Sequence, residues 1–280
     1  MPPDPPNVVL YDGVATLAGA DDPVRAYSSP GGLAFLEGNR LAGSLTLVPG
    51  GQGASASNWV HSLIMASGRG GEGRAFVLQY GRRPSAAGSE DVGVLLMGYR
   101  AGFRVARALG VGASVYYRRV RAGPAGAGAD ARDDHYLGAE GGLVAGLPGG
   151  VVVGATLSGL EVRQTSPAGP AEDAQPAGAA LNVGVAYQPV SYAVVEADLV
   201  GLLNSQRTPE ARAELRIYPG VPVGLRLGIR QSLASSESRV GWMAGVVAEA
   251  PGGRWAIGLT FLAGEPYPNL TQVGAVYVRM

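Results

Sequence analysis

Apolar and polar residues alternate along this chain in blocks of about ten residues, and this period of two constrains the fold more than any other feature. In one block Leu109, Val111 and Val115 fall on one face, while Gly, Ser, Tyr and Arg residues fall on the other. The blocks 223–230 and 254–261 repeat the pattern. A side-chain period of two belongs to β-strands. Glycine, at 45 residues, is too frequent for long helices. The pattern therefore predicts an all-β chain.

Marking each block gives fourteen expected strands. They cover 39–48, 57–67, 73–82, 91–104, 107–121, 134–147, 150–163, 178–188, 192–203, 209–218, 221–233, 239–250, 253–263 and 270–280. An even number of antiparallel strands is typical of bacterial single-chain barrels.

The connections between these strands alternate in length. Short ones are rich in Pro and Gly, which set the dihedrals of tight turns, and they fall at 147–150, 188–191, 219–220 and 251–253. Longer polar ones fall at 83–90, 122–133, 164–177, 204–208, 234–238 and 264–269. Short turns on one side and long loops on the other are typical of transmembrane barrels.

A soluble secreted β-sandwich, such as an adhesin module, also alternates apolar and polar residues. Three features favour a membrane barrel: the unequal connections, a polar face made mostly of small residues, and aromatic residues near strand ends. The aromatic residues are Tyr99, Tyr117, Tyr187, Tyr218 and Tyr277. No apolar stretch reaches the ~18 residues of a spanning helix. We therefore expect a strand-built protein of the bacterial outer membrane, in contact with lipid.

Composition excludes several classes of protein. Zero formal charge argues against a nucleic-acid partner, and the absence of cysteine excludes disulfides and thiol chemistry. His61 and His135 lack metal-ligand spacing, and we interpret the sequence 133–135 as a solvated loop end rather than a cation site. No Gly-x-Ser-x-Gly motif has a strand-turn-helix context. We expect no cofactor, no metal and no enzymatic activity.

The first 38 residues differ from the remainder, because Pro and Gly interrupt any regular element there. We predict an N-terminal hatch or extension over 1–38 and a transmembrane barrel over 39–280. Residues 1–20 either plug the barrel, form a tail or extend to a partner. Residues 1–6 show no signal-peptide features, so we expect the chain to be the processed form of an exported protein.

A motif at the end of this segment resembles the FadL-type outer-membrane transporters and their PorV-like relatives. The motif residues are Ser29, Pro30, Gly31, Gly32, Leu33, Ala34 and Phe35. In that superfamily an Asn-Pro-Ala-Gly-Leu-Ala segment ends a hatch and leads into the first strand. Here Ser29 replaces the Asn and Gly31 replaces the Ala, while Pro30, Gly32, Leu33 and Ala34 match.

The resemblance implies a fourteen-stranded barrel with one of two roles. One role is a scaffold or assembly subunit for other envelope or surface proteins, as in the PorV-like branch. The other is transport of fatty-acid-like hydrophobic small molecules. Because the chain is short and its small inward-facing residues leave little sign of a roomy cavity, we favour the scaffold.

Charged residues recur on one face of three consecutive expected strands. They are Glu196, Asp198, Arg212, Glu214, Arg216, Arg226 and Arg230. Neighbouring strands lie about 4.8 Å apart, so opposite charges are expected to pair across this ladder. We interpret it as an ion-pair network in a closed lumen rather than the lining of a polar passage. Arg118 and Glu140 are expected to extend it elsewhere on the wall.

Overall fold

A computed structural model of the chain describes eleven segments. These are 29–48, 58–83, 91–123, 132–164, 178–190, 192–204, 208–217, 223–233, 240–249, 255–264 and 267–279. The expected alternatives for residues 1–20 therefore lie outside the described residues, as do most of the expected long loops.

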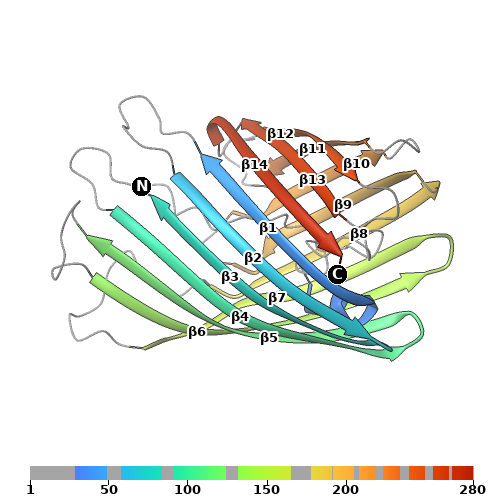
Figure 1. Cartoon of the computed structure of the whole chain (residues 1–280), viewed down its shortest axis with the longest axis horizontal. Helices are drawn as coiled ribbons and strands as arrows, with labels where there is room; N and C mark the ends of the chain where they lie inside the picture. Colours follow the sequence, from blue (N-terminus) through green and yellow to red (C-terminus); the bar gives the residue numbers. More distant parts are fainter. Residues whose placement is uncertain are drawn as a thin grey trace.

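Fourteen antiparallel strands form one closed barrel, as the sequence predicts (Figure 1). Each strand pairs with its neighbours in the chain, and β1 pairs with β14 to close the sheet. A short 3-10 helix, η1 (Pro30–Phe35), precedes the barrel. Within the described segments, no helix is long and apolar enough to cross a membrane. The strands are β1 (Gly38–Val48), β2 (Asn58–Arg69), β3 (Glu72–Arg83), β4 (Asp91–Ala106), β5 (Leu109–Gly123), β6 (Arg132–Leu147), β7 (Val151–Gln164), β8 (Ala180–Val190), β9 (Ala193–Leu202), β10 (Glu210–Ile217), β11 (Val223–Ser232), β12 (Val240–Glu249), β13 (Trp255–Gly264) and β14 (Tyr267–Arg279).

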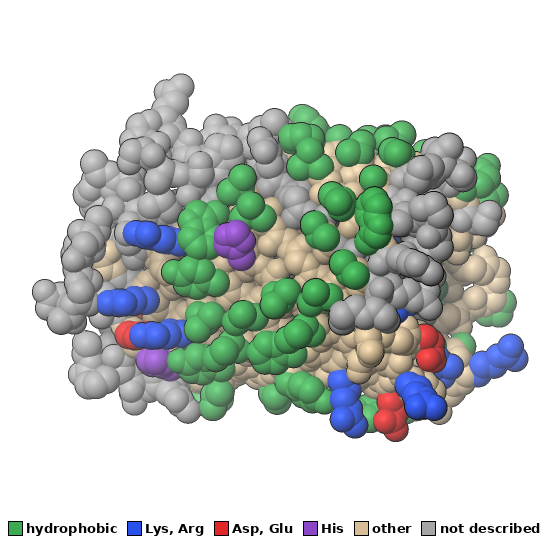
Figure 2. Space-filling view, in the orientation of Figure 1, with side chains coloured by type: hydrophobic (Ala, Val, Ile, Leu, Met, Phe, Trp, Pro, Cys, Tyr) green, Lys and Arg blue, Asp and Glu red, His purple; other side chains and the backbone are tan. Residues whose placement is uncertain are grey.

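The apolar side of each strand faces outward. Val115, Leu227 and Ile257 expose 62%, 52% and 52% of their surface, although residues of this kind are buried in soluble proteins. Figure 2 shows apolar side chains spread over the outer wall, with charged side chains gathered towards its two ends. An apolar outer band between polar ends matches the hydrocarbon layer of a bilayer. The outward-facing apolar side excludes the soluble sandwich, in which that side would pack against a second sheet.

The two ends of the barrel have different connections. At one end, called the turn end, β2 and β3 are joined by Gly70 and Gly71 alone. Both glycines have positive φ, of 63° and 93°, as a tight two-residue hairpin turn requires. The expected turn at 147–150 also lies at this end and contains Gly149 and Gly150 at positive φ. The opposite, loop end carries the longer connections 49–57, 84–90, 124–131 and 165–177.

Aromatic side chains lie on the outer wall near both ends. At the loop end the Trp59 ring lies 4.8 Å from that of His61 and 5.3 Å from that of Tyr80. Tyr187 and Trp255 are exposed near the turn end. These positions suit the two interfaces of a bilayer.

The five tyrosines singled out from the sequence are distributed less uniformly. Tyr187 lies near the end of β8, whereas Tyr99 and Tyr117 lie in the middle of β4 and β5, so these two do not belong to an interfacial girdle. Tyr218 and the side chain of Tyr277 lie outside the described part of the structure.

A bulge in β7 changes which face its residues occupy. Ala139 pairs with Leu160 and Gly141 with Leu157, so Ser158 and Gly159 together oppose one residue of β6. Gly159 has a φ of 73°, a left-handed conformation that glycine adopts readily at a bulge. Without the extra residue, strict alternation from Leu157 would turn Glu161 towards the lipid. The bulge turns this carboxylate into the lumen instead.

Because the outer face of β11 contacts lipid, a charged side chain on it is expected to destabilise the barrel more in the middle of the bilayer than near its edge. Leu227→Arg places a guanidinium in the middle of the outer face and is expected to lower the free energy of unfolding by about 2–4 kcal/mol. Gln231→Arg, on the same face near the loop end, is expected to cost about 1 kcal/mol or less. Urea titration of folding into lipid vesicles measures both values. Equal costs for the two variants would contradict the assignment.

Candidate functional site

The hatch-motif residues lie against the inner wall of the barrel near the turn end. Residues Pro30–Phe35 make the 3-10 helix η1, with Pro30 at its first position and Ser29 preceding it. Proline suits a first helical position, because its missing N–H has no partner there. The helix packs against β3, β4, β5 and β6 and touches β2. Ser29 and all of η1 except Phe35 are buried.

Six inward-facing glycines allow the backbone of this segment to approach the wall. We call them the glycine seat: Gly68, Gly73, Gly102, Gly110, Gly112 and Gly142. A Cβ added at Gly73 would lie 2.0 Å from the carbonyl oxygen of Leu33, and one at Gly112 would lie 2.3 Å from that of Pro30. Contacts this short do not occur between a Cβ and an oxygen. The seat therefore exists because these positions carry no side chain.

Apolar and cationic contacts hold the helix in the seat. Leu33 and Leu36 are each 1% exposed and pack against inward residues of β1, β2 and β3, including Ile64 and Val77. The Arg104 guanidinium lies 5.0 Å from the centre of the Phe35 ring, within cation–π range. The segment is thus docked on the β2–β6 side of the barrel.

An apolar stripe continues from the seat towards the loop end. It consists of inward-facing residues of β2, β3 and β4: Val60, Ile64, Ala66, Ala75, Val77, Val92, Val94 and Leu96. Ser62 and Gln79, which face each other across β2 and β3, interrupt it. The inner wall of a water-filled porin is polar, so this stripe is a different kind of surface.

The seven ladder residues lie on β9, β10 and β11, and the structure brings several of them into contact. The Nε atoms of Arg216 and Arg226 each donate to Glu214 Oε1 at 2.7 Å. Arg216 also pairs with Glu196, and both side chains are 3% exposed. Asp198 lies directly across from Arg212, which in turn faces Arg230 on β11. Arg212 pairs along its own strand with Glu210, a residue outside the predicted set.

A second polar cluster lines the wall from β4 to β7, and we call it the Tyr116 cluster. Its members are Arg100, Ser114, Tyr116, Arg118, Glu140 and Glu161. Glu140 accepts hydrogen bonds from Arg100 at 2.7 Å and from Ser114 at 2.8 Å. Arg118 Nε donates to Glu161 at 2.9 Å, and its guanidinium lies 4.3 Å from the Tyr136 ring centre.

The Tyr116 side chain lies across β6 at Gly138, where the wall has no side chain. Its hydroxyl donates to Glu161 at 3.1 Å, so the side chain extends from β5 over β6 to β7. The ring covers Gly138, where an added Cβ would lie 2.2 Å from it. The glycine on β6 therefore makes room for the aromatic ring, and the ring fills the space that the missing side chain leaves.

The structure separates the residues considered for a cation site at 133–135. Asp133 pairs with Arg119 and His135 contacts Tyr117, both on the outer face of the barrel. Asp134 is buried on the opposite, inward side. Among the described residues, no group of three or more acidic or histidine side chains is placed to hold a metal ion.

Sequence reasoning missed the glycine seat, Glu161 and Tyr116. The sequence contains indirect signs of these features. The inward positions of β2–β6 nearest the turn end are repeatedly glycine, and the alternation of β7 slips by one residue at Ser158 and Gly159.

Comparison with solved structures identifies proteins of the same fold. The CymD monoaromatic hydrocarbon channel superposes with a TM-score of 0.73 at 14% identity, covering 95% of this chain and 94% of the channel. The Ralstonia pickettii toluene transporter TbuX gives 0.68 at 12% identity, with 92% and 94% covered. A Pseudomonas aeruginosa FadL homologue gives 0.60 at 11% identity, with 91% and 93% covered.

At these identities the likeness establishes the fold. No family model matches the chain, and no curated protein matches it. The chain has the FadL-like outer-membrane barrel fold, and its apolar outer face agrees with that location.

The glycine seat predicts that a single methyl group dislodges η1. Because the chain has no cysteine, Leu33→Cys introduces a unique thiol at a position that is 1% exposed. Adding Gly73→Ala is expected to raise the rate of maleimide labelling roughly ten-fold, since overpacking costs about 1–3 kcal/mol. Gly141→Ala is the matched control, because a Cβ there meets nothing within 4 Å. Equal labelling of both double variants would refute the seat.

The contacts of the ladder predict that Glu214 and Glu210, both on β10, contribute unequally to the stability of the barrel. Glu214→Gln removes the shared partner of Arg216 and Arg226 and is expected to destabilise the barrel by about 3 kcal/mol, because it leaves buried charge uncompensated. Glu210→Gln breaks a more exposed pair and is expected to cost about 1 kcal/mol or less. Denaturant unfolding in vesicles measures the difference, and similar costs would mean that the lumen is fully hydrated at Glu214.

Proposed function

We propose that this chain is an outer-membrane channel for hydrophobic small molecules. The observation that carries the proposal is the inner apolar stripe on β2–β4, which runs from the loop-end half of the barrel to the docked helix η1. Apolar groups on an inner wall are poorly solvated by water, and they favour a ligand that also avoids water.

The position of η1 supports the same role. The helix occupies the turn-end part of the β2–β6 side, at the end of the stripe. A molecule moving along the stripe from the loop end would meet Leu33 and Leu36 there. The hatch motif would then act as a plug that retains the cargo until η1 moves.

The comparisons favour transport over the scaffold role that the sequence suggested. Two of the similar structures are described as a monoaromatic hydrocarbon channel and a toluene transporter. We therefore propose a compact hydrocarbon such as a monoaromatic compound as the cargo class. Such a role requires binding surfaces and a path, and no catalytic group.

Two hydroxyl groups placed on the stripe test the proposal with little change of shape. The double variant Val60→Thr, Val92→Thr is expected to lower uptake about five-fold or more, because an unpaired hydroxyl beside an apolar ligand costs about 1 kcal/mol or more. The measurement is uptake of radiolabelled toluene by intact Gram-negative cells that express the exported chain and lack a hydrocarbon channel of their own.

The matched control is Val276→Thr, Val278→Thr, which adds the same groups to the exposed outer face of β14. This control is expected to retain the unmodified chain's uptake. The proposal fails if cells expressing the unmodified chain take up no more toluene than cells with an empty vector. Stoichiometric co-purification with an envelope protein, together with absent uptake, would restore the scaffold interpretation.

A further inference from the structure

On β1 and β2, three inward-facing hydroxyl groups have no hydrogen-bond partner. They belong to Ser44, Thr46 and Ser62, and each of the three oxygen atoms is buried. The Ser62 residue as a whole is only 7% exposed. A buried hydroxyl without a partner is unfavourable, because it has lost its hydrogen bonds to water and gained none in exchange. Three such groups on neighbouring strands therefore indicate a ligand that supplies the missing partner.

These hydroxyls lie in one row across the inner wall. Ser44 lies directly opposite Ser62, which in turn lies opposite Gln79 on β3. Directly opposite residues have Cβ atoms about 5 Å apart, so the two hydroxyls and the amide follow one another across three strands. Thr46 is the next inward-facing residue of β1 and lies beside them. We call these four residues the polar row.

The polar row crosses the apolar stripe. Two residues towards the turn end, about 7 Å along each strand, β1, β2 and β3 carry Ala42, Ile64 and Val77 of the apolar cluster around the hatch motif. Towards the loop end, the next register row contains Val60 on β2 and Val94 on β4. A molecule that moves along the stripe therefore meets the polar row between two apolar layers.

The polar row is electrically neutral. In the described part of β1, β2 and β3, neither the row nor the inward-facing layer on each side of it contains a charged residue. Hydroxyl and amide groups donate as well as accept hydrogen bonds. An anionic ligand would need a cation at this position to compensate for the water that it loses. The row therefore suits an uncharged group that both donates and accepts.

We propose that the polar row binds the hydroxyl group of a monohydroxylated aromatic compound, such as a cresol. This inference rests on the proposed function and names the preferred cargo of the same channel. The ligand oxygen lies between Ser44 and Ser62, where it donates to one hydroxyl and accepts from the other, while the ring lies on the apolar stripe. A pure hydrocarbon would contact the stripe equally well but would leave both serine hydroxyls unpaired. The row therefore distinguishes the two kinds of cargo.

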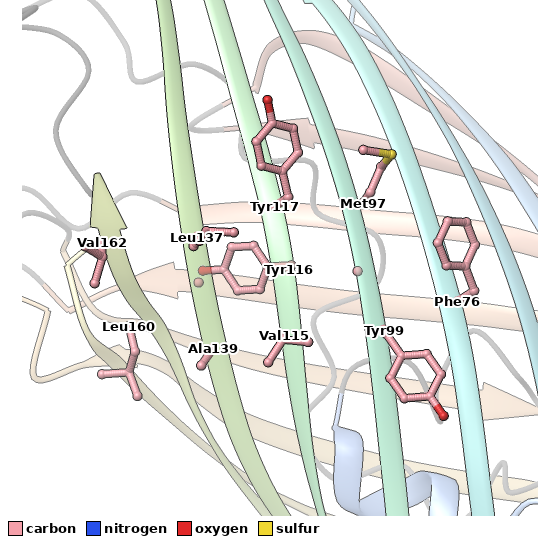
Figure 3. Close-up of a pocket in the computed structure, with 12 residues that line it drawn as sticks. Phe76, Met97, Tyr99, Val115, Tyr116, Tyr117, Leu137, Ala139, Leu160 and Val162 are labelled. Carbon is pink, nitrogen blue, oxygen red and sulfur yellow. The ribbon is translucent and has the colours of Figure 1, made fainter. Parts of the chain in front are cut away.

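The outer wall offers a second surface for an aromatic compound, and this surface supplies a control. An apolar groove of about 560 Å³ is lined by outward-facing residues that include Phe76 and Leu137 (Figure 3). Tyr99 and Tyr117 contribute two hydroxyl groups to its lining, and that of Tyr117 contacts His135. Because the groove faces the lipid, a compound bound there has not passed along the lumen. Loss of two hydroxyls can thus be compared on the two sides of the wall.

The test compares uptake of radiolabelled p-cresol with that of toluene, which differs from it by one hydroxyl group. Intact Gram-negative cells without a hydrocarbon channel of their own express the exported chain, and uptake by empty-vector cells is subtracted. Ser44→Ala, Ser62→Ala is expected to lower p-cresol uptake about ten-fold, because two hydrogen bonds are lost, without lowering toluene uptake. The matched control Tyr99→Phe, Tyr117→Phe removes two hydroxyls from the outer groove and is expected to change neither uptake.

Heat-modifiable migration on gels verifies that each variant is folded. The proposal is supported if the serine variant loses p-cresol uptake and keeps toluene uptake. It is overturned, with the channel function intact, if that variant takes up p-cresol as the unmodified chain does, if both uptakes fall equally, or if the tyrosine control loses as much p-cresol uptake. An unmodified chain that takes up neither compound would instead overturn the channel function, and this inference with it.

Discussion

Contact between the outer wall and acyl chains is the constraint on which the other features of this barrel depend. An outward-facing charge in the middle of the wall costs about 2–4 kcal/mol, so the charged side chains of the wall's central part have to point into the lumen. Because side chains alternate strictly along a strand, each strand needs the correct register to achieve this. In β7 the Ser158–Gly159 bulge corrects the register, and without it Glu161 would face lipid instead of Arg118.

Inside the barrel, polar groups pair with one another on separate parts of the wall. The ladder on β9–β11 is organised by Glu214, and the Tyr116 cluster on β4–β7 by Glu140 and Glu161. Charges of opposite sign on adjacent strands satisfy one another's hydrogen-bonding groups, so their burial in the wall is compensated. The β2–β4 wall carries few such charges and instead presents the apolar stripe. Polar pairing on the other parts of the wall thus leaves this arc apolar, which is the surface that the proposed hydrophobic cargo requires.

Much of the fold could be predicted from the sequence, because period-two alternation and turn residues are local signals. All fourteen strands were located, and the ladder residues were assigned to a common face because β9, β10 and β11 alternate without interruption. The glycine seat could not be found in this way, since Gly73 and Gly112 matter only through contacts with residues far away in the chain. Glu161 was missed because a bulge reverses its direction. The preference for a scaffold role rested on chain length and small residues, which do not reveal the inner stripe.

The barrel is asymmetric around its circumference, because the strands of one arc are longer than those of the other. Strands β4–β6 have 15 or 16 residues, whereas β9–β13 have 8 to 10. The longer strands carry much of the glycine seat and most of the Tyr116 cluster. They lie side by side in one arc of the wall (Figure 1). Strand length beyond what the hydrocarbon requires is not needed for insertion. On this arc the inner face receives η1 at the glycine seat and carries the paired charges of the Tyr116 cluster, so the same strands position both.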